Sequence, residues 1–230
     1  MNHAKFVGIL IACAALVGCA SHSNSPYQSL SQGQVDKLNA DHSAEDPTPK
    51  PLTADTHFAA GQVAETQNDP NNAINQYKEA LKLDANHLPS LYRLAVLYCK
   101  LKQFDDAVAT WKQYVKATHD SGGANSNLAF CYELAGQPLQ AEETYQHGIA
   151  RDPKSIACRT NYGLMLARQQ HINEAIRVWQ PVLSEAEIDY NLASVYELDG
   201  RKLEAKAEYQ KAIELDPKLA DAKARLAALQ

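Results

Sequence analysis

The stretch NLAFCYELAGQPLQAEETYQHGIARDP, residues 127–153, contains two apolar helical patterns separated by a short turn. Gly136 stands where the first pattern ends, and Asp152-Pro153 follows the second. A glycine after a helix suits a left-handed C-terminal cap, and the residue before a proline is disfavoured in a helix. The stretch therefore predicts two antiparallel helices joined by a tight turn.

The same pattern recurs along the chain, with repeats that start near residues 54, 88, 122, 156 and 186. Places are counted here from the start of each repeat. The eighth place holds a small residue: Gly61, Ala95, Ala129, Gly163 and Ala193. The twentieth place holds alanine: Ala73, Ala107, Ala141, Ala175 and Ala205. The twenty-fourth place holds an aromatic residue: Tyr77, Trp111, Tyr145, Trp179 and Tyr209. Small residues let two helices approach closely, and a large aromatic then fills the gap toward the next repeat.

This spacing resembles the tetratricopeptide repeat, and the resemblance covers residues 54–230. It implies an all-α fold: a right-handed superhelical solenoid of antiparallel helix pairs, with about five repeats. Residues 219–230 form an amphipathic pattern that predicts a single capping helix over the last apolar face. The fourth repeat is four residues short, since 186 − 156 = 30, and the missing turn follows Trp179. We expect a truncated second helix there, or a tight connection.

The N-terminus carries an apolar run, Phe6–Val17, which is too short for a helix that crosses a bilayer. It fits the apolar core of a signal peptide. The following Leu16-Val17-Gly18-Cys19 resembles the lipobox of bacterial lipoproteins. The resemblance implies removal of residues 1–18 and acylation of both the thiol and the new α-amino group of Cys19. The alternative is a cysteine buried in an N-terminal helix.

Residues 19–53 are rich in serine, proline, asparagine and aspartate and show no helical or strand period. This composition predicts a lipidated N-terminus followed by a disordered tether. In a Gram-negative host, Ala20 after the cysteine would imply a place on the periplasmic face of the outer membrane. We expect a membrane contact through the lipid anchor, because two or more acyl chains hold a protein stably.

A solenoid of this kind exposes a concave groove lined by the first helix of each repeat. The sixth place, which faces the groove in this family, holds Arg93, Asn127, Asn161, Asn191 and Arg225. The three asparagines resemble the ladders with which some tetratricopeptide arrays hold an extended peptide. A carboxamide offers both a donor and an acceptor, so it can pair with peptide C=O and N–H groups together. The alternative is that these asparagines are merely polar and solvated.

Aromatic residues on the same face, Tyr92, Phe130 and Tyr190, are candidate anchors for a partner. Packing between first helices is the competing interpretation, above all for Phe130. Gln62 and Phe58 occupy the places where a lysine–asparagine clamp for a C-terminal carboxylate would begin. We therefore do not expect recognition of a chain terminus.

Several function classes find no support in the sequence. The net charge of −5 gives no basic footprint for nucleic acid. No catalytic or phosphate-binding motif occurs, and the histidines show no ligand spacing. We expect no enzyme, cofactor, metal or small-molecule substrate. Cys99, Cys131 and Cys158 fit small buried residues, and their spacing leaves disulfide pairing open.

The sequence thus predicts a membrane-anchored scaffold that recruits a protein or an extended peptide segment through its groove. Its layout resembles that of the tetratricopeptide lipoproteins of Tad or type IV pilus assembly, which implies a role in pilus or secretion-machine assembly. An adaptor for peptidoglycan hydrolases and a subunit of outer-membrane protein assembly fit the same layout. An enzyme acting on the cell wall and an oligomerising spacer are the alternatives from other classes.

Overall fold

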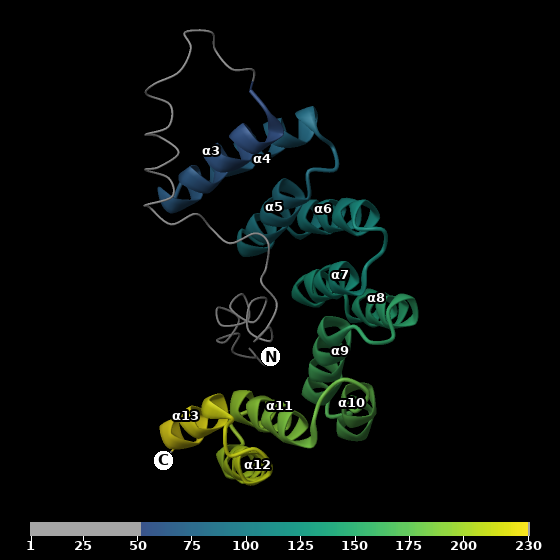
Figure 1. Ribbon diagram of the computed structural model, residues 1–230, viewed down its shortest axis with the longest axis vertical. Helices are drawn as coiled ribbons and strands as arrows, with labels where there is room; N and C mark the ends of the chain where they lie inside the picture. The colour runs from purple at the N-terminus through teal and green to yellow at the C-terminus, as the bar shows by residue number, and fades with distance from the viewer. Residues whose placement is uncertain (1–51, 230) are drawn as a thin grey trace, which may run out of the picture. The chain divides into compact units, whose positions relative to one another are not determined.

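The computed structural model describes residues 52–229. The predicted signal peptide, Cys19 and all of the expected tether except its last two residues therefore lie outside the described residues. Residues 52–229 form eleven α-helices and no strand (Figure 1). The helices are α3 (Ala54–Thr66), α4 (Pro70–Leu83), α5 (Leu88–Lys100), α6 (Phe104–Ala117), α7 (Gly122–Leu134), α8 (Pro138–Arg151), α9 (Ile156–Arg168), α10 (Ile172–Trp179), α11 (Glu185–Leu198), α12 (Lys202–Leu215) and α13 (Ala220–Ala228). The all-helical prediction is confirmed.

The described chain divides into two compact bodies. The N-terminal body comprises residues 52–120 and 131–137, and the C-terminal body comprises 121–130 and 138–229. In the N-terminal body, α3 packs on α4, α4 on α5 and α5 on α6. In the C-terminal body, α9 packs on α8, α10 and α11, and α12 packs on α11 and α13. Each body is therefore a succession of helix pairs.

The places that define the repeat form the core. The alanines of the twentieth place are fully buried, and the aromatics of the twenty-fourth place are at most 1% exposed. The glycines of the eighth place mark the closest approach between paired helices. A Cβ atom built on Gly61 would lie 2.5 Å from the Tyr77 ring, and one on Gly163 would overlap the indole of Trp179. The predicted role of the small residues is thereby confirmed.

Each first helix ends in the same hydrogen-bonded turn, with a left-handed residue at the fifteenth place. Gly136 and Gly200 adopt φ values of 72° and 75°, as their expected capping role requires. The amide of Gly200 donates to the carbonyl of Glu197, and the next amide, that of Arg201, donates to the carbonyl of Tyr196. Three non-glycine residues adopt this conformation in the other repeats, namely Asn68, Lys102 and Gln170.

The fourth repeat carries the expected shortening. Helix α10 has 8 residues, whereas α12 has 14. After α10, the amides of Val182 and Leu183 both donate to the carbonyl of Trp179, so the chain turns at once. Helix α11 then begins with a capping box between Ser184 and Glu187. The shortened helix and the tight connection occur together.

Helix α13 covers the apolar side of the last pair. Ala222 is fully buried in a cluster with Tyr209 and Ala212 of α12, and Leu226 packs against the same cluster. Such a helix shields the final repeat from water. Among residues 52–229, no helix is both long and apolar enough to span a membrane.

Candidate functional site

Aromatic residues at the fifth place pack inward rather than standing free. Tyr92 lies 5.4 Å from Trp111 between ring centroids, in an edge-to-face arrangement. Tyr190 lies 5.6 Å from Tyr209, and Phe58 makes the corresponding contact with the ring of its own repeat. In these three repeats, the fifth-place ring therefore covers the twenty-fourth-place ring, which stabilises the helix pair.

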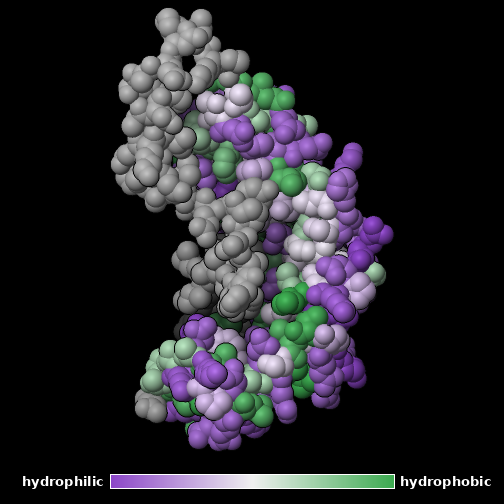
Figure 2. Space-filling view, in the orientation of Figure 1, coloured by the Kyte–Doolittle hydropathy of each residue, from purple (hydrophilic) through white to green (hydrophobic). Residues whose placement is uncertain are grey.

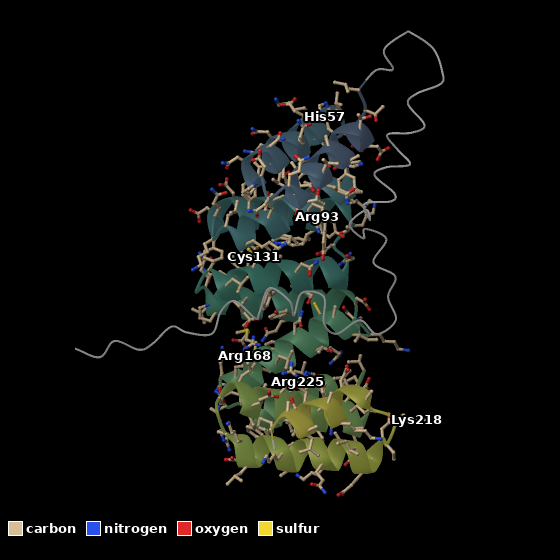
Figure 3. The ribbon with its side chains drawn as sticks, turned by 90° about the vertical axis from the view of Figure 1, so that its left-hand side faces the viewer. His57, Arg93, Cys131, Arg168, Lys218 and Arg225 are labelled. Atoms are coloured by element: carbon tan, nitrogen blue, oxygen red, sulfur yellow. The ribbon has the colours of Figure 1, made fainter. Side chains whose placement is uncertain are left out.

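A charged cluster joins the first two repeats in the N-terminal body. Glu65 of α3 accepts hydrogen bonds from Arg93 of α5, at 3.0 Å from Nε and 2.5 Å from Nη2. The phenol of Tyr77 donates to the same carboxylate at 2.5 Å. Burial and the Glu65 carboxylate raise the pKa of Tyr77, and Glu65 raises the pKa of Arg93. The Arg93 guanidinium, labelled in Figure 3, is thus held by an intramolecular partner.

The same cluster recurs in the C-terminal body with the same sequence spacing. Tyr209 lies 12 residues after Glu197 and donates to it at 2.8 Å, and Arg225 lies 28 residues after Glu197 and donates to it at 3.4 Å. Figure 3 labels Arg225 on α13. We call these two clusters the Glu–Tyr–Arg triads. They join α3 to α5 and α11 to α13, so the two arginines predicted to line the groove have structural carboxylate partners.

The three asparagines of the sixth place lie on successive first helices of the C-terminal body: Asn127 on α7, Asn161 on α9 and Asn191 on α11. We call them the amide row. Asn161 donates from Nδ2 to the hydroxyl of Ser126 on α7 at 2.9 Å. Helices α9 and α11 are also in contact. The row therefore runs across three neighbouring helices.

Asn191 is the most enclosed member of the amide row, with 6% of its surface exposed. Its carboxamide has no hydrogen-bond partner among the described residues. The amide atoms are not fully enclosed, so they still reach solvent. Asn127 is half-buried and likewise has no side-chain partner within residues 52–229. A carboxamide in such a position retains its donor and its acceptor for a ligand.

The sequence register accounts for the free amide of Asn191. The place that carries glutamate in the triads carries Ala167 in the fourth repeat, and the aromatic of that repeat is Trp179. The indole donates to the carbonyl of Thr160 at 3.0 Å and offers no phenolic oxygen. Because neither a carboxylate nor a phenol is present, an arginine at position 191 would lack the partners that hold Arg225.

Small hydroxyl residues accompany the amide row at the fifth place. Ser126 donates to the carbonyl of Ala157 at 3.1 Å, and Thr160 is 2% exposed. The hydroxyl of Thr160 is the one enclosed side-chain polar atom without a partner in the described part of the chain. Where the other repeats place an aromatic ring, the third and fourth repeats therefore place a short polar side chain beside each asparagine.

The candidate anchors differ in exposure. Tyr92 and Tyr190 are half-buried against their partner rings, whereas Phe130 is buried with 9% of its surface exposed. The packing interpretation therefore suits Phe130 best. Burial raises the pKa of Tyr92. Half-buried tyrosines can still present one ring edge to a partner.

Polar residues dominate the face shown in Figure 2, with hydrophobic residues interspersed. Three glutamates of the first helices serve the fold: Glu65 and Glu197 belong to the triads, and Glu187 closes the capping box of α11. Across residues 52–229, no group of three or more histidine, cysteine, aspartate or glutamate residues could hold a metal ion.

Sequence reasoning found the asparagines but missed the groups around them. Ser126 and Thr160 gave no recognisable signal in the sequence, because single hydroxyl residues are common in helices. The triads did leave a signal: the offsets from Glu65 to Tyr77 and Arg93 equal those from Glu197 to the C-terminal pair. A search for a repeated Glu–Tyr–Arg spacing would have separated the structural arginines from the asparagines.

Comparison with known proteins agrees with this geometry. Two family profiles, both described as tetratricopeptide repeat, match residues 58–122 and 186–219. The general transcriptional corepressor ssn6 of Schizosaccharomyces pombe is 27% identical over 129 residues, which is 54% of this chain. The chain spans 12% of the length of that relative.

Two solved bacterial structures have the same fold. A thermophilic tetratricopeptide-repeat protein of Thermus thermophilus superposes with a TM-score of 0.53 at 24% identity, covering 76% of this chain and 98% of its own. The pilF protein of Pseudomonas aeruginosa gives a TM-score of 0.53 at 16% identity, covering 85% and 93%. These identities establish the fold only. The chain is thus all-helical, and its residues 58–122 and 186–219 carry tetratricopeptide repeats, a class of module that binds proteins or peptides.

Proposed function

We propose that this protein is a membrane-anchored scaffold that holds an extended segment of a partner protein along its amide row. The observation that carries the proposal is Asn191: the residue is 6% exposed, and its carboxamide reaches solvent without a hydrogen-bond partner among the described residues. A hydrogen bond that replaces water at such a group contributes about 0.5–1.5 kcal/mol net. A peptide backbone that pairs with it would gain this free energy on binding.

The amide row suits a peptide backbone better than a particular side chain. Each carboxamide can donate to a peptide C=O and accept from a peptide N–H. Three such groups on successive helices would read the backbone at intervals, so recognition would tolerate many sequences. The half-buried ring of Tyr190, next to Asn191 in α11, would add an apolar contact.

A peptide-binding experiment tests the site. Fluorescence anisotropy with a set of unrelated extended peptides should detect binding to the protein, and N-methylation of alternate peptide amides should weaken it. The triple variant Asn127→Ala, Asn161→Ala, Asn191→Ala should lose at least about tenfold in affinity, equivalent to about 1.4 kcal/mol. The matched control changes three exposed asparagines on second helices to alanine: Asn71, Asn75 and Asn173.

The control variant should bind as the unchanged protein does, and circular dichroism should show that both variants keep their helices. Undiminished binding by the amide-row variant would refute the proposed site. Binding that survives N-methylation would refute backbone recognition, and would favour capture of side chains.

The membrane part of the proposal rests on Leu16-Val17-Gly18-Cys19, in the sequence outside the described residues. Labelling of cells with a radioactive fatty acid should mark the protein, and Cys19→Ser should abolish both the label and its recovery with membranes. Cys13→Ser is the matched control, because Cys13 lies in the segment that the signal peptidase would remove. Labelling at full level in Cys19→Ser would contradict the lipid anchor.

We further propose that the anchored scaffold serves assembly of a pilus or secretion machine. The layout of anchor, tether and repeats supports this role, while the likeness to pilF concerns the fold. Deletion of the gene should reduce surface pili or secreted protein, and restoring the amide-row variant should not rescue the defect. An altered pattern of peptidoglycan cleavage or of outer-membrane proteins would instead favour the two adaptor alternatives.

A further inference from the structure

Cys99 of α5 and Cys131 of α7 lie side by side within the N-terminal body. Their Sγ atoms are 3.5 Å apart, although the residues are 32 positions apart in the sequence. Both side chains are enclosed, with exposed fractions of 4% and 0%. Figure 3 labels Cys131. The fold therefore brings together two thiols that sequence spacing could not pair.

We propose that Cys99 and Cys131 are a modification site, at which a disulfide joins the first helices of the second and third repeats under oxidising conditions. A disulfide bond is about 2.05 Å long, so the sulfur atoms must approach by about 1.5 Å from their present 3.5 Å. A rotation of roughly 25° about the Cα–Cβ bond of each side chain supplies a movement of this size. The backbone can therefore stay close to its present course.

The two thiols differ in pKa, so one of them is the better attacking group in thiol–disulfide exchange. The hydrogen bond shared with Cys131 lowers the pKa of Cys99. The same hydrogen bond, together with burial, raises the pKa of Cys131. The thiolate is the nucleophile in thiol–disulfide exchange, so Cys99 reacts first.

The reaction needs an external disulfide, such as oxidised glutathione or a disulfide-bearing oxidase. The Cys99 thiolate attacks one sulfur of that disulfide, which forms a mixed disulfide and releases one thiol. The Cys131 thiolate then attacks the sulfur of Cys99 and releases the second thiol. Two protein thiols are oxidised, one external disulfide is reduced to two thiols, and the two thiol protons pass to these leaving groups.

Enclosure of both sulfur atoms sets the conditions of the reaction. The oxidant reaches Cys99 during folding or when the helices open locally, because local opening precedes global unfolding in most proteins. Once closed, the disulfide lies away from solvent and resists reduction. It would restrain the 31 residues between the two cysteines and so stabilise the junction between neighbouring repeats.

Cys158 provides an internal control. Its thiol donates to the carbonyl of Gly122 at 3.1 Å, and a Cβ atom built on Gly148 would lie 2.5 Å from its sulfur. Burial raises the pKa of Cys158 to about 12. We therefore expect Cys158 to stay reduced where the other two are oxidised.

Differential alkylation of the full chain tests the proposal. The protein is incubated with oxidised glutathione, denatured and alkylated before and after reduction, and mass spectrometry then follows each cysteine separately. Cys99 and Cys131 should resist alkylation until reduction, whereas Cys158 should react before it. A non-reduced digest should contain the peptide pair that joins positions 99 and 131, in protein that migrates as a monomer.

Thermal unfolding provides a second measurement. Reduction should lower the Tm of the oxidised protein, and of its Cys158→Ala variant, by about 5–10 °C. The Cys99→Ala variant should show no effect of reduction, and Cys131 should become alkylatable in it. Full alkylation of all three cysteines before reduction, or a pair that includes Cys158, would overturn the proposal.

Discussion

The carboxylate of Glu65 accepts two hydrogen bonds from Arg93, across the junction between the first and second repeats. Both side chains are largely enclosed, with exposed fractions of 14% and 18%. A pair in this position has given up much of its hydration, so loss of one partner leaves a poorly solvated charge. The contact therefore contributes to the solenoid junction rather than to a partner site.

Glu65→Gln should lower the free energy of unfolding by about 2–4 kcal/mol, measured by urea denaturation, because Arg93 keeps its charge without a carboxylate. Arg93→Gln should have a similar cost, and the double variant should cost less than the sum. Lys82→Gln is the control, since the Lys82–Glu79 pair is exposed and should leave the midpoint unchanged. Strict additivity of the two changes would contradict a direct interaction.

The protein should lose stability above pH 10 through the triad tyrosines. Burial raises the pKa of Tyr77 and Tyr209 above the usual value of 10.0. The unfolded chain then releases these protons first, so the unfolding free energy is fully retained below pH 10 and falls as pH rises further. Each tyrosine contributes a slope of at most about 1.4 kcal/mol per pH unit.

Unfolding of the variant with Tyr77→Phe and Tyr209→Phe should therefore depend less on pH between about 10 and 11. The control is Tyr196→Phe, because Tyr196 belongs to neither triad. An equal alkaline loss in the double variant would show that other groups cause the effect.

Gly163→Ala should destabilise the fourth repeat, because the added methyl group overlaps the fully enclosed indole of Trp179. We expect a loss of about 1–3 kcal/mol in thermal or urea unfolding. Gly123→Ala is the control, since nothing lies within 4 Å of the added atom and alanine favours a helix. No loss in Gly163→Ala would mean that α9 and α10 can move apart enough to accept a Cβ atom at the eighth place, as α5 and α6 do at Ala95.

Lys102→Gly should stabilise the protein by about 0.5–1 kcal/mol, because Lys102 adopts a left-handed φ of 60° that disfavours a side chain. Its amide donates to the carbonyl of Cys99, and glycine retains this bond. Lys100→Gly, at the last residue of α5, should have the opposite sign, by at most about 1 kcal/mol. If both variants changed the stability in the same direction, the assignment of strain to position 102 would be refuted.

Much of the fold could be predicted because each defining place has a local physical cause. Gly136 and Gly200 indicated helix ends directly, since a left-handed cap favours glycine. Lys102 and Gln170 form the same turn without any such signal. The gap after Trp179 predicted the short α10, because a missing helical turn changes the count of residues.

The site was harder to predict, since residues at one place of the repeat differ in their surroundings. Arg93 and Asn191 both occupy the sixth place, but only Arg93 meets a carboxylate from the preceding repeat. Cys99 and Cys131 stand at different places of their repeats, so alignment of the repeats did not pair them.

The sequence by itself determined the helix pairs, their period and the shortened fourth repeat, because small, aromatic and turn residues act through local packing and backbone conformation. Tertiary structure decided which polar side chains have partners. Glu65 meets Arg93, and Cys99 meets Cys131, only when helices about 30 residues apart are packed together. The unpaired amide of Asn191 has the same kind of cause: the preceding repeat carries Ala167 at the place where Glu65 meets Arg93, so it supplies no carboxylate there.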